Sequence, residues 1–426
     1  MAKYVIVGAS AAGLGAIEAI RDVDPVGTIT VITEEACSHY SRPMISDFVS
    51  GKADIKKVNC RTEGFWNENK VEALLEKKVT ALNFAEKVVQ LESGEKVPYE
   101  KLLIATGGKP FVPKMEGSDK DGVFTFTTLK DAQLLAAKID SINAKAAVVI
   151  GAGLIGISVA EALVKRGLKV TIVELQDKIL SLLLDPKGSD IVDAVVRKAG
   201  VNIITGQSVQ KIIGKPGNDG AVGGVVLTKG DQVPCDLVVV AIGVVPRTEL
   251  VAGTAVKINR GIVVDDMMQT SVPDVYASGD VAEAYDFVLN QNRLLPLWPL
   301  AVLEGQVAGC NMAGKKTTYS GGTNMSSLKY FGIPVVSVGL ANPKEDPSLE
   351  VLVKFEPERN VYKKLVLKNN VIVGMTLVNS IERAGILYYL MKNAINVKKL
   401  KQQLLEDDFS WAAFPVGLQR KMSVVQ

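Results

Sequence analysis

Two glycine-rich motifs of the same kind constrain this chain more than any other feature: GASAAG, residues 8–13, and GAGLIG, residues 151–156. Each motif follows a short apolar run and precedes a stretch of small and apolar residues that is typical of a helix. A second apolar run then ends in acidic residues, Glu34 and Glu35 after the first motif and Glu174 after the second. This order of strand, glycine turn, helix, strand and acid is typical of a dinucleotide-binding unit.

Physical chemistry explains why this pattern binds nucleotides. The turn glycines let the backbone approach a pyrophosphate, and the helix N-terminus offers unpaired N–H groups and the positive end of a dipole. The acid that follows, somewhat over twenty residues past the first glycine, accepts hydrogen bonds from a ribose. A single glycine triplet is a weak signal, but two complete units in one chain predict two different nucleotide cofactors.

The composition excludes several classes of protein. With 426 residues, the chain is long enough for two or three domains. Its longest apolar stretch, 237–245, is far shorter than the roughly 20 residues of a membrane span, so we expect no membrane crossing. A net charge of +3 is too small to indicate nucleic-acid binding. The first strand follows the initiating Met so closely that we expect no signal peptide and a cytoplasmic location.

The four cysteines form no close pair in the sequence. This spacing fits a reducing compartment and predicts neither a disulfide framework nor a metal site.

Two further apolar runs end in small residues and a proline. They are KLLIATGGKP, residues 101–110, and DLVVVAIGVVP, residues 236–246, and each marks the end of a domain because proline is unfavourable inside a strand. SVPDVYASGD, residues 271–280, adds another strand that ends in Gly279 and Asp280. From about residue 315 the pattern changes to strands and turns, with Asn369-Asn370 as an expected hairpin turn, and predicts an α+β tail.

Six motifs occur in the order GxSxxG, ATGG, GxGxxG, AIGxxP, SGD and WPxA. In this order the chain resembles the FAD- and NAD(P)-dependent pyridine nucleotide–disulfide oxidoreductase superfamily over nearly its whole length. YSRPMIS, residues 40–46, and the tail are similar to the branch that contains rubredoxin reductase and the flavoprotein region of NADH-dependent nitrite reductase.

The resemblance implies an α/β fold of the glutathione reductase type, in which an NAD domain is inserted into an FAD domain. Both are Rossmann-like, and a C-terminal α+β interface domain follows. The implied limits are 1–112 and 246–316 for the two parts of the FAD domain, 113–245 for the NAD domain and 317–426 for the interface domain.

The resemblance also implies which residues hold each cofactor. For FAD they are Gly8, Ser10, Ala11, Ala12, Gly13, Glu34, Glu35, Arg42, Pro43, Thr106, Gly107, Gly279 and Asp280. For the nicotinamide nucleotide they are Gly151, Gly153, Leu154, Ile155, Gly156, Glu174 and Gly243. Glu174 favours NADH because its carboxylate binds two ribose hydroxyls and repels a 2′-phosphate.

The chain departs from its relatives at the flavin. Disulfide reductases of the superfamily carry a cysteine pair there, and its NADH oxidases and coenzyme A disulfide reductases a single cysteine, whereas this chain reads SRPMIS. Cys37 is the nearest thiol, and His39, the only histidine, would activate it as an imidazolium. We expect both to be loop residues without redox chemistry, with a Cys37-dependent NADH oxidase or coenzyme A disulfide reductase as the alternative.

A second departure concerns charge. Related sequences often pair a lysine with a glutamate beside the flavin, and this chain has Asp47 and Ser158 at those positions. Both partners differ together, so no single buried charge is left without its partner.

Without a thiol relay, the flavin must reduce the acceptor directly. We therefore predict an FAD-dependent NADH:acceptor oxidoreductase that passes electrons to a small iron–sulfur carrier such as rubredoxin or ferredoxin, in a direction that the two potentials decide. The alternative from another class is an electron-transfer subunit of a larger metalloenzyme complex. By analogy with related flavoenzymes we expect a homodimer.

Overall fold

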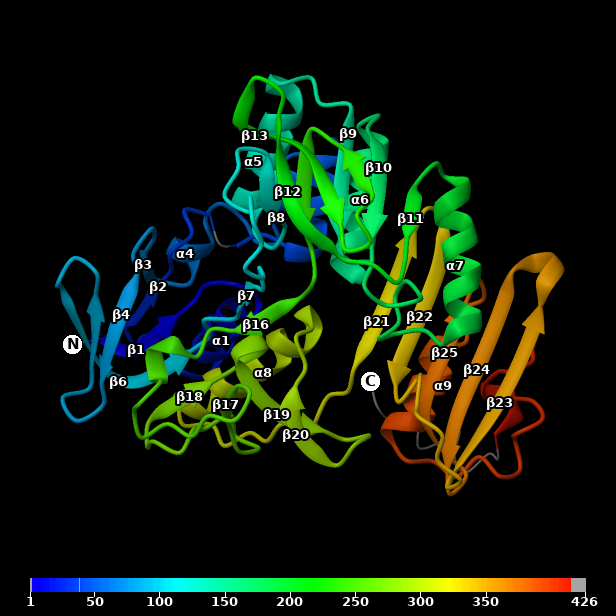
Figure 1. The fold of residues 1–426 in the computed structure, drawn as a ribbon. Helices are drawn as coiled ribbons and strands as arrows, with labels where there is room; N and C mark the ends of the chain where they lie inside the picture. Colours follow the sequence, from blue (N-terminus) through cyan, green and yellow to red (C-terminus); the bar gives the residue numbers. More distant parts are fainter. Residues whose placement is uncertain (1, 38, 415–426) are drawn as a thin grey trace.

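In the computed structural model, residues 2–37 and 39–414 are described. The first sheet follows the order β3, β2, β1, β6, β5, β4, with β18 beside β6 (Figure 1). The bounds are β1 Ala2–Val7, β2 Ile29–Ile32, β3 Val71–Leu74, β4 Val79–Asn83, β5 Val88–Leu91, β6 Lys96–Ile104 and β18 Val275–Ala277. Strands β3, β2, β1, β6 and β18 run parallel. Because β18 pairs with β6, segments from before and after the second glycine motif share one sheet.

The second motif lies in a five-stranded parallel sheet of order β11, β10, β9, β15, β8. These strands are β8 Val123–Thr125, β9 Ala146–Ile150, β10 Lys169–Val173, β11 Asn202–Ile204 and β15 Leu237–Val240. Its helices are α5 Leu129–Ser141, α6 Leu154–Lys165 and α7 Pro186–Lys198. An antiparallel sheet of β12 Val209–Lys215, β13 Asn218–Leu227 and β14 Gln232–Pro234 follows α7 and β11 in the chain. A two-stranded antiparallel ribbon, β7 Gly108–Pro110 with β16 Val244–Pro246, joins the two halves.

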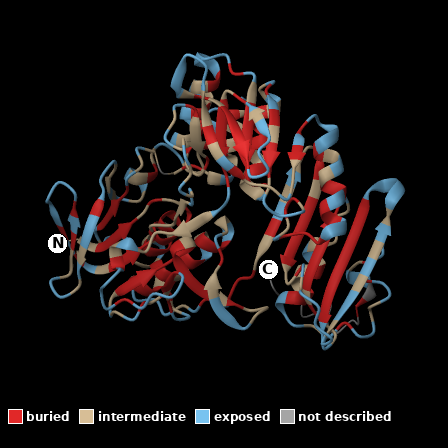
Figure 2. Cartoon of the chain, in the orientation of Figure 1, coloured by how far each residue is buried: buried red, intermediate tan, exposed pale blue. Residues whose placement is uncertain are grey.

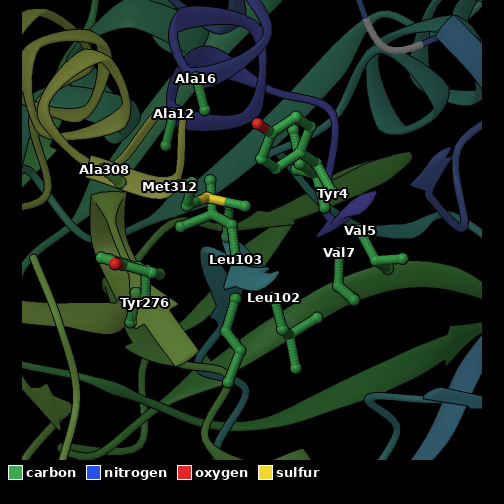
Figure 3. Close-up of a cluster of buried hydrophobic side chains, with 14 of the residues drawn as sticks. Tyr4, Val5, Val7, Ala12, Ala16, Leu102, Leu103, Tyr276, Ala308 and Met312 are labelled. Carbon is green, nitrogen blue, oxygen red and sulfur yellow. The ribbon is translucent and has the colours of Figure 1, made fainter. Parts of the chain in front are cut away.

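Helices α1, Ala11–Val23, and α8, Trp298–Met312, pack closely against each other. Glycine makes this approach possible, since a Cβ at Gly305 would lie 2.0 Å from the carbonyl oxygen of Ala12, and one at Gly309 2.4 Å from that of Ala16. Figure 3 shows Ala12, Ala16, Ala308 and Met312 gathered in the same buried core as Leu103. The small residues of the first motif therefore serve helix packing as well as the turn.

Three short helices and a small sheet complete the part of the chain that contains the first sheet. The short helices are α2 Ile45–Val49, α3 Ile55–Val58 and α4 Phe65–Glu68. A three-stranded sheet consists of β17 Ile262–Val263, β19 Ala282–Asp286 and β20 Gln291–Leu294. Of the helices in the described residues, none combines the length and apolar character that a membrane crossing requires.

The C-terminal part is a five-stranded antiparallel sheet of order β21, β22, β25, β24, β23. The strands are β21 Met325–Tyr330, β22 Ile333–Gly339, β23 Leu349–Glu356, β24 Val361–Lys368 and β25 Val371–Val378, followed by α9 Ala384–Lys392. Figure 2 shows its central strands buried, because α9 covers one face and the half of the chain that carries α7 packs on the other. Asn369 and Asn370 both have positive φ, 53° and 62°, at the predicted turn between β24 and β25. The predicted fold class is confirmed.

Candidate functional site

A single cavity of about 2460 Å³ connects the two glycine motifs. It is lined by the turns that follow β1 and β9, by the β7 and β16 ribbon, by the turn at Gly279 and by strand β21. The carboxyl ends of the parallel strands in both sheets open into it, which is where α/β folds bind nucleotides. The predicted motifs at residues 8–13 and 151–156 therefore line one cavity.

The two glycine turns have the same geometry. Gly8 has φ of 108°, and a Cβ on Gly13 would lie 2.1 Å from the carbonyl oxygen of Gly8. Gly151 has φ of 102°, and a Cβ on Gly156 would lie 1.9 Å from the carbonyl oxygen of Gly151. Glycine is therefore required at these positions by the chain's own backbone.

Gly153 differs from these glycines because a Cβ there would meet no protein atom within 4 Å. It stands at the N-cap of α6 and on the cavity wall. A glycine that leaves open space at a helix N-terminus fits a position where a pyrophosphate approaches the backbone. Ser10 holds the corresponding place before α1, where its hydroxyl accepts a hydrogen bond from Arg42 Nε at 3.1 Å.

The two acids after β2 have different surroundings. Glu35 accepts a hydrogen bond from the Tyr40 hydroxyl at 2.6 Å and pairs with the Arg42 guanidinium. Glu34 pairs with Arg247 at 3.0 Å, and about half of its side chain is exposed on the cavity wall. Of the two, Glu34 has the more exposed carboxylate and a single protein partner, whereas Glu35 has two protein partners.

Arg42 links several of the predicted flavin-side residues. Besides Ser10 and Glu35, it donates to the carbonyl oxygen of Thr127 at 2.8 Å. Burial raises the pKa of the Asp280 carboxyl, and the positive charge of Arg42 opposes this shift. Pro43, Thr106, Gly107 and Gly279 line the same cavity. The predicted flavin-side residues therefore lie together.

Sequence reasoning missed Glu304, which lies on α8 and is 2% exposed. Its carboxyl accepts a hydrogen bond from the backbone N–H of Gly279 at 2.8 Å. Burial raises the pKa of Glu304 to about 8; the Gly279 N–H opposes the shift and the nearby Asp280 charge adds to it. The available signal was a lone acid in an otherwise apolar helix.

In the other half, Glu174 follows β10 and accepts two backbone hydrogen bonds. The donors are the N–H groups of Ala152, at 2.6 Å, and Gln176, at 2.8 Å. The first comes from the glycine turn itself, so the acid and the turn are fixed relative to each other. Gly243, with φ of 125° and open space beside it, lines the same cavity.

The surroundings of Cys37 do not favour a thiolate. Burial raises the pKa of the Cys37 thiol, whose sulfur lies 3.8 Å from Oδ1 of Asn59. Burial also lowers the pKa of His39, whose ring packs edge-on against Trp66. An imidazolium that activates this thiol would require the opposite shift of both pKa values.

Asp47 lies on the cavity wall and pairs with Lys52 at 3.2 Å. Ser158, the other departure from the related sequences, lies on the wall from α6. In residues 2–37 and 39–414, no cluster of three or more His, Cys, Asp or Glu side chains suits a metal ion.

The fold and the paired glycine turns define a protein that binds two nucleotides. Residues 2–305 match the family described as pyridine nucleotide-disulphide oxidoreductase, and residues 325–395 match the rubredoxin NAD+ reductase C-terminal domain. The chain belongs to the pyridine nucleotide-disulphide oxidoreductase family, whose members use FAD and NAD(P)H. It is an NADH-dependent flavoprotein oxidoreductase, and the predicted branch is confirmed.

Individual relatives agree with this assignment. The chain is 34% identical to the NADH-dependent phenylglyoxylate dehydrogenase subunit epsilon of Aromatoleum evansii, over 95% of this chain and 94% of that protein. It is 31% identical to the rubredoxin-NAD(+) reductase of Pseudomonas putida, over 74% of this chain and 80% of the relative. The solved structure of a NAD-dependent persulfide reductase from A. fulgidus superposes with a TM-score of 0.88 at 27% identity, covering 99% of this chain and 83% of that chain.

Proposed function

We propose that this protein is an NADH:acceptor oxidoreductase that passes electrons through FAD to a small iron–sulfur carrier of the rubredoxin or ferredoxin type. The observation that carries the proposal is the single cavity lined by both glycine motifs, because hydride transfer requires the two cofactors to meet. When bound, FAD supplies the chemistry: it accepts a hydride and releases electrons one at a time. The protein's residues bind and orient the two cofactors.

The cavity suggests which cofactor each half holds. FAD is assigned to the half that contains Gly8, Glu34, Arg42 and Asp280, and NADH to the half that contains Gly151 and the other predicted nicotinamide-nucleotide residues. The partly exposed carboxylate of Glu34 supports the assignment of FAD to the first half. The open space at Gly153 supports the assignment of NADH to the second half. The pairing of β18 with β6 supports an FAD domain in two parts, 1–112 and 246–316, around an NAD domain of 113–245.

Direct transfer from flavin to acceptor is favoured over a thiol relay. The raised pKa of Cys37 keeps its thiol protonated. The lowered pKa of His39 keeps the imidazole neutral, so it provides no positive charge to stabilise a thiolate. A carrier that takes single electrons is then the natural acceptor. The rubredoxin-NAD(+) reductase of Pseudomonas putida is a relative whose name states this chemistry.

The proposal is tested by anaerobic mixing of the FAD-loaded protein with NADH or NADPH, followed by absorbance of the flavin. We expect rapid bleaching by NADH and slower bleaching by NADPH, because Glu174 repels a 2′-phosphate. Reduced protein is then offered rubredoxin, ferredoxin, a disulfide or oxygen, and the iron–sulfur carriers should reoxidise it fastest. A flavin that NADH does not reduce would overturn the proposal.

A second candidate is an electron-transfer subunit of a larger redox complex, in which this chain passes electrons to or from a metalloenzyme partner. It is favoured by the 34% identity to a protein named as subunit epsilon, with nearly full coverage of both chains. Co-purification of the tagged chain with an iron–sulfur partner would support this reading. A purified particle of only this chain that is fully active with free carrier would support the first candidate, and a mass of two copies would support the predicted homodimer.

A further inference from the structure

We infer that the C-terminal sheet positions the NADH-binding half, so that residues of this sheet determine NADH affinity without belonging to either glycine motif. The inference deepens the proposed function and rests on its assignment of NADH to the second motif. Two sets of hydrogen bonds carry it. One reaches the N-terminus of α6, and the other reaches a loop, residues 179–185, that lines the cavity.

The first contact comes from Tyr330, the last residue of β21. Its hydroxyl donates a hydrogen bond to the carbonyl oxygen of Leu154 at 2.8 Å. Leu154 begins α6, directly after Gly153, where the backbone leaves open space for a ligand. Burial raises the pKa of Tyr330, so the hydroxyl stays protonated and remains a donor at physiological pH. The sheet therefore fixes the helix end on which a pyrophosphate would rest.

The second contact holds the loop, four of whose residues, Leu180 to Leu183, line the cavity. On its inner side, the N–H of Leu180 donates to the carbonyl oxygen of Ala152, in the glycine turn, at 2.9 Å. On its outer side, the Ser337 hydroxyl donates to the carbonyl oxygen of Leu183 at 2.7 Å. The loop is therefore held between the glycine turn and the C-terminal sheet.

A buried cluster anchors the end of the loop. Asp185 accepts hydrogen bonds from the Tyr362 hydroxyl at 2.6 Å and from Lys364 Nζ at 2.8 Å, both on β24. The same carboxylate accepts the N–H of Gly188 and so caps α7. Although burial opposes it, these donors lower the pKa of Asp185, which keeps the carboxyl ionised. Loss of either β24 partner would leave a buried charge incompletely paired.

The side chains of the loop, residues 179–185, differ in their exposure. Leu180 and Leu183 are buried, whereas Leu182 between them is 91% exposed on the cavity wall. An apolar side chain held toward a nucleotide cavity, on a loop whose backbone is fixed from both sides, fits a contact surface for the bound dinucleotide. The C-terminal sheet supplies the outer fixation, so its removal should affect NADH before FAD.

The test uses Tyr330→Phe and Ser337→Ala, singly and together, in the full-length FAD-loaded protein. Tyr285→Phe and Ser141→Ala are matched controls, since each removes a hydroxyl that is bonded elsewhere, to Asn290 and to the carbonyl oxygen of Lys138. We expect the double variant to raise the Kd for NAD+, measured by titration of the flavin spectrum, and the KM for NADH about tenfold. FAD content, melting temperature and reduction by dithionite should match the controls.

The outcomes separate the two claims. If the wild-type flavin is reduced by NADH but the double variant binds NAD+ as tightly as the controls, the inference is overturned and the proposed function stands. If NADH fails to reduce the wild-type flavin, the proposed function falls and the inference falls with it. Should the double variant lose FAD or unfold, Tyr330→Phe alone decides, because it removes one oxygen atom at a partly exposed side chain.

Discussion

Replacement of Glu304 by glutamine tests the consequence of burying an acid beneath the turn at Gly279. Burial moves the pKa of Glu304 from its ordinary 4.5 to about 8. The folded protein then keeps a proton that the unfolded chain has already released between these two values. Stability therefore falls as pH rises through this window, by about 1.4 kcal/mol for each pH unit. Because the carboxyl is half ionised at pH 8, the loss from pH 6 to pH 8 amounts to about 2 kcal/mol.

Glutamine removes this pH dependence while keeping the local structure. Its carbonyl oxygen accepts the Gly279 N–H, and its amide has the shape of a protonated carboxyl. We expect the Glu304→Gln protein to gain about 2 kcal/mol relative to wild type between pH 6 and pH 8, with little further change above pH 9.

The measurement is urea unfolding of the FAD-loaded proteins at pH 6, 7, 8 and 9, followed by flavin fluorescence and circular dichroism. Glu95→Gln is the control, because Glu95 is exposed and its replacement should produce the same difference at every pH. A stability difference between Glu304→Gln and wild type that varies by less than about 0.5 kcal/mol over the series would refute the reasoning.

Four other substitutions test the site. Glu174→Ala removes the carboxylate that repels a 2′-phosphate, so kcat/KM for NADH should fall about tenfold while that for NADPH falls less or rises. Cys37→Ser should leave NADH-dependent carrier reduction within about twofold of wild type, and a loss above tenfold would revive the thiol-dependent alternative. Gly156→Ala places a Cβ about 1.9 Å from the carbonyl oxygen of Gly151, so NAD+ titration should show weaker binding, while Gly153→Ala, which meets no protein atom, should retain the melting temperature.

Local sequence patterns predicted much of the nucleotide-binding frame. The same turn requires glycine at positions 8 and 13, so the spacing of these glycines follows directly from the backbone geometry. The hairpin at Asn369 and Asn370 was predictable for a similar reason, since asparagine tolerates positive φ. The sequence could not separate the roles of Glu34 and Glu35, because the partner of Glu34, Arg247, comes from a distant segment.

What the sequence by itself determined is the class of the fold and the number of nucleotide cofactors, since both depend on spacing within about thirty residues. Tertiary structure decided the rest. Arg247 reaches Glu34 across 213 positions, and Lys364 reaches Asp185 across 179. Such contacts depend on how sheets and helices pack, and neither periodicity nor motif spacing encodes them. The buried proton on Glu304 has the same origin, because only packing removes a carboxyl from water.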